Sequence, residues 1–339
     1  MSAEANRGRQ MLMFAAKMVV SGLLIWFVLS RLTLAEIRDA VTAPHWGWLL
    51  AALAVYGLSA LAGAQQWAWI LRAAGITAPA REIRRLYFIG LFFNNFLPAN
   101  IGGDVYKVID LGRREHRPLG VFCATRMDRL IGLGALTALA VVVLAFAAAA
   151  GILLPTTSLL MIPVLVLLFA VLALLLSRRL GALLPGWIRR LGLPKVADQV
   201  ARVTEEFGRY RHQVRFMNGI FAFSVLVQLL RMATHLLVAL GLGIALSGTQ
   251  MVQLLVLVPM VAIMLTLPVT INGIGLRETV SAGLLVAAGV TEPQAVAMEV
   301  AAYLVQVVFS LQGGALLWLG KWGRAEAPPA SAEPNDGNR

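Results

Sequence analysis

The sequence predicts an all-α polytopic membrane protein, with about six full transmembrane helices plus two re-entrant or broken helical hairpins, roughly eight membrane segments in all. Three observations predict this fold. The chain is 59% hydrophobic and only 14% charged, whereas soluble domains carry about 25% charged residues. Several apolar runs reach the ~20 residues that a helix needs to cross a bilayer. Two further apolar segments, one in each half, are interrupted by proline, glycine and polar residues, and such paired interruptions point to the binding site of many transporters.

The uninterrupted apolar runs are expected to cross the bilayer completely. They lie near residues 11–30, 46–71, 122–150, 159–177, 216–246 and 295–320. The first of these runs is longer than the apolar part of a typical signal peptide and lacks a small-residue cleavage site, so we expect it to remain as a span. Tryptophans such as Trp46 and Trp318 stand at the ends of expected spans, where they suit the membrane interface.

One motif occurs twice, at the centres of the interrupted segments 84–112 and 251–290. Residues 97–107 read LPANIGGDVYK, and residues 267–277 read LPVTINGIGLR. Irregular backbone inside a bilayer must be buried in protein or line a wet cavity, so we expect each motif to form the apex of a re-entrant hairpin. A pair of short helices that cross completely would give the same loop charges, and the sequence leaves that alternative open.

The distribution of Lys and Arg predicts the orientation of the chain. Basic residues gather in the loops around 72–85 and 107–117 and in the linker 178–215, which holds nine Lys and Arg against three acids. All of these loops lie on the cytoplasmic side if the chain begins and ends there. The chain then consists of two units, each with three crossings and one hairpin. Three is an odd number, so the second unit is inverted relative to the first.

The domain boundaries follow from this topology. We expect residues 1–10 and 324–339 to be disordered, because they are short, polar and poor in apolar residues. Membrane repeat 1 covers 11–155, and membrane repeat 2 covers 156–323. The second repeat includes the basic amphipathic linker 178–215, which either lies on the inner membrane surface or packs on the cytoplasmic ends of the bundle.

Composition and motifs exclude several classes of function. The single cysteine, Cys123, cannot form an internal disulfide, and the four scattered histidines lack a ligand spacing such as HExxH. The net charge of +12 indicates cytoplasmic loops beside anionic lipid rather than a nucleic-acid partner. We therefore expect no metal, no cofactor and no catalytic residue.

Ionisable side chains within apolar segments are costly, and they mark functional sites by default. Basic groups are the majority among them, which favours an anionic ligand over a cation channel. A helix that restarts after each apex would present N–H groups that suit phosphate, and both motif copies keep a cation at the same place. The candidate substrate-binding residues are Asn94, Asn95, Asn100, Asp104, Lys107, Arg126, Asp128, Arg129, Arg231, Asn272, Arg277, Glu278 and Glu299.

Several of these residues have a structural alternative. Arg126 and Arg129 come just before an apolar run, so they either snorkel to the inner interface or clamp a headgroup at the mouth of a cavity. Arg231 and Glu299 pair with each other in one interpretation, whereas Glu299 or Asp104 carries a proton in another. The sequence does not decide between these alternatives.

Three stretches carry a family resemblance, namely FFNNFLPANIGGDVYKVIDLGRR, TRMDRLIGL and LPVTINGIGLRE. They resemble the signature stretches of flippase-like membrane proteins related to the transmembrane domain of lysylphosphatidylglycerol synthase (the multiple peptide resistance factor), over about residues 10–320. The resemblance implies movement of a lipid across the bacterial inner membrane. The lysyl-transferring relatives carry a large soluble domain after the membrane part, whereas about fifteen polar residues follow the last expected span here. Aminoacyl transfer is therefore not expected.

We therefore expect a lipid translocator in the bacterial inner membrane, with both termini cytoplasmic, that moves an anionic or isoprenoid-linked lipid. The headgroup would enter a cavity between the two hairpins. Two other classes stay open. A membrane-embedded lipid-modifying enzyme would need convergent acids or a nucleophile, and Asp104, Asp128 and Glu278 are the only plausible set. A non-transporting scaffold would bind lipid-synthesis enzymes through the linker 178–215.

Overall fold

The computed structural model describes most of the membrane segments of the chain. It covers residues 44–96, 102–152, 166, 186–190, 194–208, 210, 213–264 and 276–325. Within these ranges the regular secondary structure is helical, and no strand occurs.

Four of the described helices are long and apolar enough to cross a membrane. They are α3 (Trp46–Ala73), α6 (Pro118–Ala149), α10 (Val214–Gly241) and α13 (Glu292–Ala325). A helix of 28 residues, such as α3, measures about 42 Å, which exceeds the ~30 Å hydrocarbon core. These four helices confirm the expected spans in the corresponding parts of the sequence. The expected span 11–30 lies outside the described residues, and so does 159–177 apart from residue 166.

Each interrupted segment forms a pair of shorter helices. The first pair is α4 (Ala80–Phe96) and α5 (Gly102–Arg114), and the second is α11 (Gly248–Met264) and α12 (Leu276–Ala287). These helices have 17, 13, 17 and 12 residues, so the longest measures about 26 Å. The described part of each of the four is shorter than the ~30 Å of a full crossing. The two apices, residues 97–101 and 265–275, lie outside the described residues.

The turns that lead into the two hairpins have the same backbone geometry. Gly75 ends the turn after α3 with φ 72°, and Gly243 ends the turn after α10 with φ 71°. The N–H of the following isoleucine, Ile76 or Ile244, donates to a carbonyl five residues earlier, at 2.9 and 3.0 Å. This is the Schellman motif, in which glycine supplies the left-handed conformation. Both isoleucines are buried, so each turn is fixed by packing as well.

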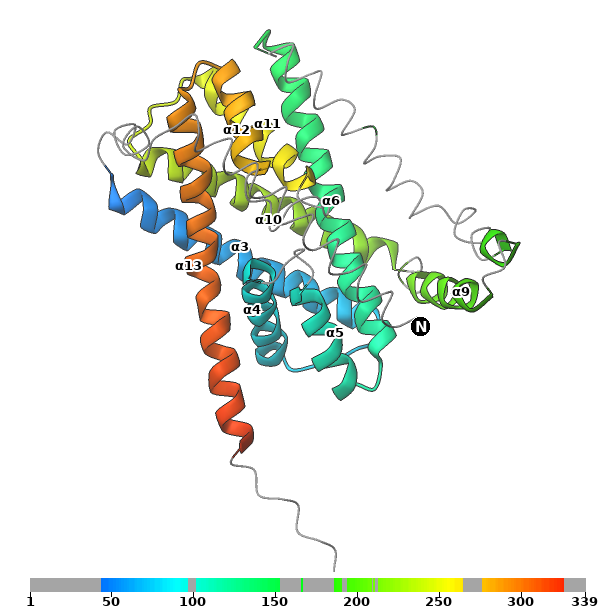
Figure 1. Cartoon of the computed structure of the whole chain (residues 1–339). Coiled ribbons are helices and arrows are strands. Elements are labelled where there is room, and N and C mark those ends of the chain that lie inside the picture. The colour runs from blue at the N-terminus through cyan, green and yellow to red at the C-terminus, as the bar shows by residue number, and fades with distance from the viewer. Residues whose placement is uncertain are drawn as a thin grey trace, which may run out of the picture.

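Helices α3 and α10 pack along each other in opposite directions, at the centre of the structure (Figure 1). At one end, the backbone N–H of His45 donates to the carbonyl of Gly241 at 2.8 Å. At the other end, Nε2 of Gln213 donates to the carbonyl of Ala73 at 3.0 Å. A Cβ atom at Gly241 would lie 2.5 Å from the Leu49 side chain. The two helices are therefore joined at both ends and closely packed.

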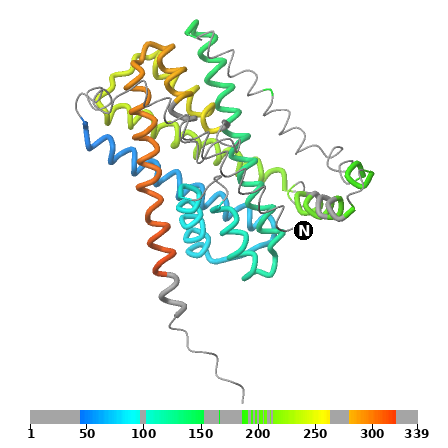
Figure 2. The backbone as a smooth tube through the Cα atoms, in the orientation of Figure 1, coloured from blue at the N-terminus to red at the C-terminus, as the bar shows by residue number. Residues whose placement is uncertain are grey.

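The other helices pack around this pair in a pattern that repeats. In the first half, α3 and α5 each contact α4 and α6; in the second half, α10 and α12 each contact α11 and α13. Between the halves, α4 contacts α13 and α11 contacts α6, while α6 contacts α10 and α13 contacts α3. Exchanging α3, α4, α5 and α6 for α10, α11, α12 and α13 therefore reproduces the same set of packed pairs. Figure 2 shows the path of the chain through both halves.

Close helix packing in this bundle depends on particular glycines. A Cβ atom at Gly313 of α13 would lie 2.1 Å from the carbonyl oxygen of Phe88 in α4. Glycine at such a position lets two helix backbones approach closely, which is how helices associate inside a membrane.

The described part of the basic linker packs on the bundle. Its helix α9 (Pro194–Gly208) contacts α6. Ala197 and Tyr210 are buried, and Phe207 packs against the core formed by α3, α4 and α6. The described residues thus agree with packing on the ends of the helices, which was one of the two alternatives. The cytoplasmic location of the linker stays a prediction.

Candidate functional site

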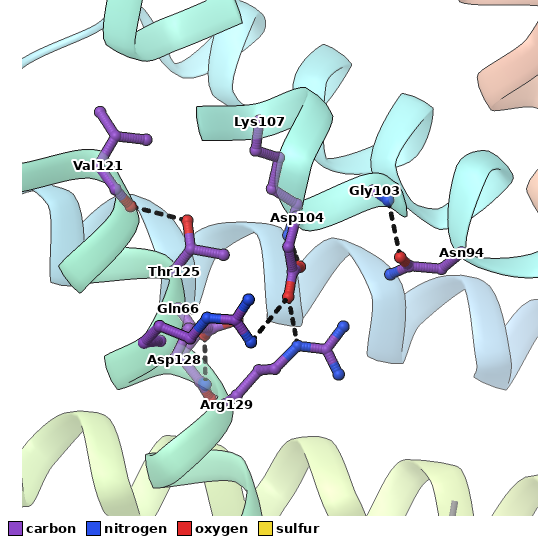
Figure 3. A network of polar contacts seen from close by, with 10 residues as sticks. Gln66, Asn94, Gly103, Asp104, Lys107, Val121, Thr125, Asp128 and Arg129 are labelled. Carbon is purple, nitrogen blue, oxygen red and sulfur yellow. Dashed lines mark hydrogen bonds and ion pairs between the residues drawn. The ribbon is translucent and has the colours of Figure 1, made fainter. Parts of the chain in front are cut away.

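The two arms of the first hairpin touch through glycines. A Cβ atom at Gly103 of α5 would lie 2.0 Å from the carbonyl oxygen of Gly90 in α4. The N–H of Gly103, in the first turn of α5, donates to Oδ1 of Asn94 at 2.9 Å (Figure 3). The first N–H groups of a helix have no partner within the helix, so Asn94 satisfies one of them. The predicted binding residue Asn94 therefore holds the hairpin together.

Lys107 lies one turn further along α5, among aromatic rings. Its Nζ atom is 4.9 Å from the ring centroid of Trp67 in α3 and 4.6 Å from that of Tyr87 in α4. A cation over an aromatic face is attracted by the negative face of the ring, and the attraction grows when water is excluded. The Lys107 side chain is only 6% exposed. We call the two rings that contact Lys107, those of Trp67 and Tyr87, the aromatic cage.

Asp104 is the point on which the cations of this region converge. Its carboxylate lies 3.7 Å from Nζ of Lys107, and its Oδ2 atom lies 2.5 Å from Nε of Arg129 and 4.0 Å from Nη1 of Arg126. The Asp104 side chain is 4% exposed. It stands in the first turn of α5, where the helix dipole favours a negative charge. We call these four residues, Asp104, Lys107, Arg126 and Arg129, the hairpin charge cluster.

The two arginines of the cluster come from one face of α6. Arg126 and Arg129 are three residues apart, which places them on neighbouring turns of the same face. Both reach the same carboxylate oxygen of Asp104, although they are 35% and 34% exposed. The Arg126 guanidinium also lies 5.3 Å from the Phe122 ring. The terminal nitrogens of Arg129 point away from Asp104 (Figure 3).

Asp128 lies beside the cluster and has a different partner. Its Oδ1 atom accepts a hydrogen bond from Nε2 of Gln66 at 2.8 Å (Figure 3). Gln66 is buried in α3, and its Oε1 atom has no hydrogen-bond partner within the described part of the chain. Asp128 thus links α6 to α3, while Asp104 links α6 to α5.

The charged residues of the second half are arranged differently. Glu299 of α13 is buried, and its Oε1 atom lies 3.9 Å from Nε2 of His235 in α10. Nδ1 of His235 lies 3.1 Å from the carbonyl of Arg231. Among the described contacts, His235 rather than Arg231 is therefore the partner of Glu299. The pairing of Arg231 with Glu299 was one of the interpretations that the sequence allowed.

The structure brings together some of the predicted site residues and leaves others undescribed. Asn94 and Asp128 adjoin the hairpin charge cluster, and Arg231 of α10 interacts electrostatically with Asp128 and Tyr87. Glu299 lies on α13, beside His235. Asn95 lies at the end of α4 and is half-buried. The candidates Asn100 and Asn272 lie outside the described residues, and so do the side chains of Arg277 and Glu278. A shared cavity between the two hairpins stays a prediction.

Sequence reasoning missed three residues of the site. Gln66 has a signal, because it is a polar residue within an apolar run. Trp67 and Tyr87 have none, because an aromatic residue in an apolar helix gives no indication of whether its ring faces lipid, core or a cation. The three-dimensional packing of α3, α4 and α5 is needed to place both rings over Lys107.

Among the described residues, the three cations of the hairpin charge cluster face two carboxylates, Asp104 within the cluster and Asp128 beside it. Three cations share one carboxylate, and two of the four side chains are nearly fully buried. Charge in a poorly hydrated environment is costly unless it is paired, and guanidinium groups form strong charge-assisted bonds to carboxylate and phosphate. The arrangement therefore suits an anion. Among the described residues, no group of three or more His, Cys, Asp or Glu side chains is placed to hold a metal ion.

The fold and this site define a multi-pass helical membrane protein with a cationic site at a broken hairpin. The chain belongs to the lysylphosphatidylglycerol synthase TM region family, which it matches over residues 14–314. This match includes both copies of the duplicated motif and confirms the resemblance found in the sequence. Membership indicates a lipid-related function in a membrane, and no catalytic domain is evident in the matched region. No curated protein matches the chain.

Proposed function

We propose that the protein is a lipid translocator that moves a lipid with a phosphate-bearing, anionic headgroup across the bacterial inner membrane. The observation that carries this proposal is the hairpin charge cluster, in which three cations meet one carboxylate beside the interruption of α4 and α5. Anionic phospholipids and isoprenoid-linked lipids both carry phosphate, so the cluster suits either. The acyl or isoprenoid chains would stay in the bilayer while the headgroup moves.

The position of the arginines along α6 supports this proposal. The uncharged part of α6 runs from Leu130 to Ala149, about 30 Å of helix, which is enough to span the hydrocarbon core. Arg129 directly precedes this stretch, and Arg126 lies about 5 Å further along the helix axis. A headgroup that enters from this end of the uncharged stretch would therefore meet both arginines.

The packing pattern supports the transport part of the proposal. The antiparallel pair α3 and α10, and the matching contacts of the two halves, are what an inverted repeat would produce. The described parts of α4, α5, α11 and α12 are each shorter than a full crossing, in keeping with re-entrant hairpins. In transporters of this architecture, one repeat rocks against the other around a site formed by broken helices.

A flip assay in proteoliposomes tests this function. Purified protein is reconstituted with a phosphatidic acid that carries a fluorophore on its acyl chain, and a membrane-impermeant reductant bleaches the outer leaflet. We expect the protein to expose the inner-leaflet phosphatidic acid to the reductant, and the variant Arg126→Gln/Arg129→Gln to abolish this. A matched control, Arg72→Gln/Arg189→Gln, removes two exposed cations away from the cluster and should behave as wild type.

The same assay with labelled diacylglycerol and phosphatidylcholine tests whether the headgroup matters. Diacylglycerol crosses bilayers unaided, so its rate should be the same with and without protein. Phosphatidylcholine should stay protected, because its ammonium group cancels the charge of the phosphate. If wild-type protein leaves every phosphate-bearing lipid protected, or scrambles phosphatidylcholine as fast as phosphatidic acid, the proposed function is wrong.

A further inference from the structure

The four residues of the hairpin charge cluster do not have the same role. We propose that Arg126 and Arg129 contact the phosphate of the headgroup, whereas Lys107 and Asp104 are positioning residues that hold the two arginines. This assignment rests on the proposed function for the identity of the ligand as a lipid, and it specifies which side chains the phosphate meets.

Exposure separates the two roles. The side chains of Arg126 and Arg129 are 35% and 34% exposed, whereas those of Lys107 and Asp104 are 6% and 4% exposed. A headgroup that approaches from outside the bundle therefore meets the guanidinium groups first. Asp104 lies on the inner side of the cluster, because it touches the buried ammonium of Lys107 as well as both arginines.

The ammonium of Lys107 is already surrounded. The rings of Trp67 and Tyr87 lie within 5 Å of Nζ, and Asp104 lies at 3.7 Å. The stem of the side chain is held as well, because a Cβ atom at Gly90 would lie 2.8 Å from Cε of Lys107. A phosphate could reach Nζ only by displacing Asp104 or a ring. The charge of Lys107 thus acts on Asp104 rather than on a ligand.

Asp104 fixes the direction in which the arginines face. Its Oδ2 atom binds Nε of Arg129 at 2.5 Å, and the terminal nitrogens of that guanidinium point away from the carboxylate (Figure 3). The same oxygen lies 4.0 Å from Arg126, so two like charges are kept adjacent. Two neighbouring guanidinium groups match the geometry of phosphate, which arginine binds through paired N–H bonds and lysine does not.

The proposal is tested by lipid binding in nanodiscs of phosphatidylcholine, which needs no transport. The probe is a fluorescent phosphatidic acid labelled on its acyl chain, and the competitors are unlabelled phosphatidic acid, diacylglycerol and inorganic phosphate. We expect only phosphatidic acid to displace the probe. Displacement by diacylglycerol would mean that the chains rather than the phosphate are bound. Displacement by inorganic phosphate at equal concentration would mean that the site takes free phosphate. Either result would overturn the assignment.

Charge-conserving variants separate contact from positioning. Arg126→Lys and Arg129→Lys keep the charge but lose the paired N–H groups with which a guanidinium binds phosphate. Each should therefore weaken binding of the probe about tenfold. Lys107→Met removes the charge that acts on Asp104 but keeps an apolar stem, so we expect binding to weaken by about threefold, less than in Arg129→Lys. Equal weakening by Lys107→Met and Arg129→Lys would show that Lys107 is a ligand and would refute the division of roles.

Asp104 offers a test in which charge and geometry predict opposite results. Asp104→Asn makes the cluster more positive, so simple attraction predicts tighter binding of phosphatidic acid. Loss of the anchor for Arg129 predicts binding about tenfold weaker, and Asp104→Glu should restore at least part of it. Tighter binding by Asp104→Asn would contradict the positioning role. The thermal midpoint of each variant in detergent confirms that it is folded before its affinity is compared.

The two proposals can fail separately. If the variants change binding as expected but wild-type protein does not flip lipid, the assignment of the arginines stands and the translocator function is wrong. If wild-type protein flips phosphatidic acid and Arg126→Lys and Arg129→Lys bind the probe as wild type does, the translocator stands and the assignment of the arginines is wrong.

Discussion

The two hairpins share a packing pattern but differ in chemistry. Helices α4 and α5 contact each other and their neighbours as α11 and α12 do. In the first motif, however, Asp104 gathers three cations, whereas the matching position of the second motif is Ile274. A buried acid of the second half, Glu299, instead lies on a long helix beside His235. Among the described residues, the two hairpins therefore share their backbone packing, whereas the cluster of one buried carboxylate with three cations lies in the first half.

The largest expected effect concerns the contact between the hairpin arms. Gly103→Ala places a Cβ atom 2.0 Å from the carbonyl oxygen of Gly90, and backbone cannot shift as a side chain does. We expect a destabilisation of about 3 kcal/mol. Gly283→Ala in α12 is the matched change in the second hairpin, and nothing lies within 4 Å of its added Cβ. It should stabilise by up to about 1 kcal/mol, because alanine is the better helix former.

Thermal unfolding in detergent measures both glycine variants. Equal midpoints for Gly103→Ala and Gly283→Ala would show that α4 and α5 do not approach through Gly90 and Gly103, and the comparison between the hairpins would lose its structural basis.

The next effect compares the two buried acids. Asp104→Ala leaves three cations without the carboxylate that they share, so we expect a loss of about 3 kcal/mol. Glu299→Gln removes a charge that faces one histidine at 3.9 Å, and an amide can still form a hydrogen bond there, so the loss should be about 1 kcal/mol. Chemical denaturation followed by tryptophan fluorescence gives both values. If Glu299→Gln lost more stability than Asp104→Ala, the main charge site would have to be assigned to the second half rather than the first.

A smaller effect concerns the aromatic cage. Trp67→Phe keeps an aromatic ring over Lys107 but reduces the attraction and the buried area, so we expect a loss of about 2 kcal/mol. The affinity for the labelled phosphatidic acid should stay within about threefold of wild type, since Trp67 acts on a positioning residue. A stable Trp67→Phe variant that no longer binds the lipid would indicate that the ring contacts the headgroup.

The last prediction concerns the central pair of helices, α3 and α10, and has the smallest expected effect on stability. It is read out by whether two introduced cysteines are cross-linked or not. In a Cys123→Ala background, cysteines at Ala73 and Gln213 should be joined by a short bismaleimide, because these residues meet at one end of α3 and α10. The control pair, Ala73→Cys with Leu240→Cys, lies at opposite ends of the two helices and should not be joined; Leu240 is exposed, so its replacement leaves the seam intact. Joining of the control pair alone would mean that the two helices run in the same direction.

The sequence predicted the framework of this molecule better than its site. The four described spans and the two pairs of hairpin helices follow from apolar run length, proline and glycine, which act locally. It also singled out Asp104, Lys107, Arg126 and Arg129, because charge inside an apolar segment is conspicuous. It did not predict the aromatic partners of Lys107, or that His235 lies beside Glu299, because these contacts depend on how separate helices rotate against each other.

The hydrogen bonds at the two ends of α3 and α10 determine which motions the protein can make at low cost. Pulling the two helices apart would break the bond of His45 to Gly241 and that of Gln213 to Ala73 at once, and it would open a tightly filled seam along their whole length. In the translocator that we propose, this pair would therefore stay together, and the movement would take place in the helices packed around it.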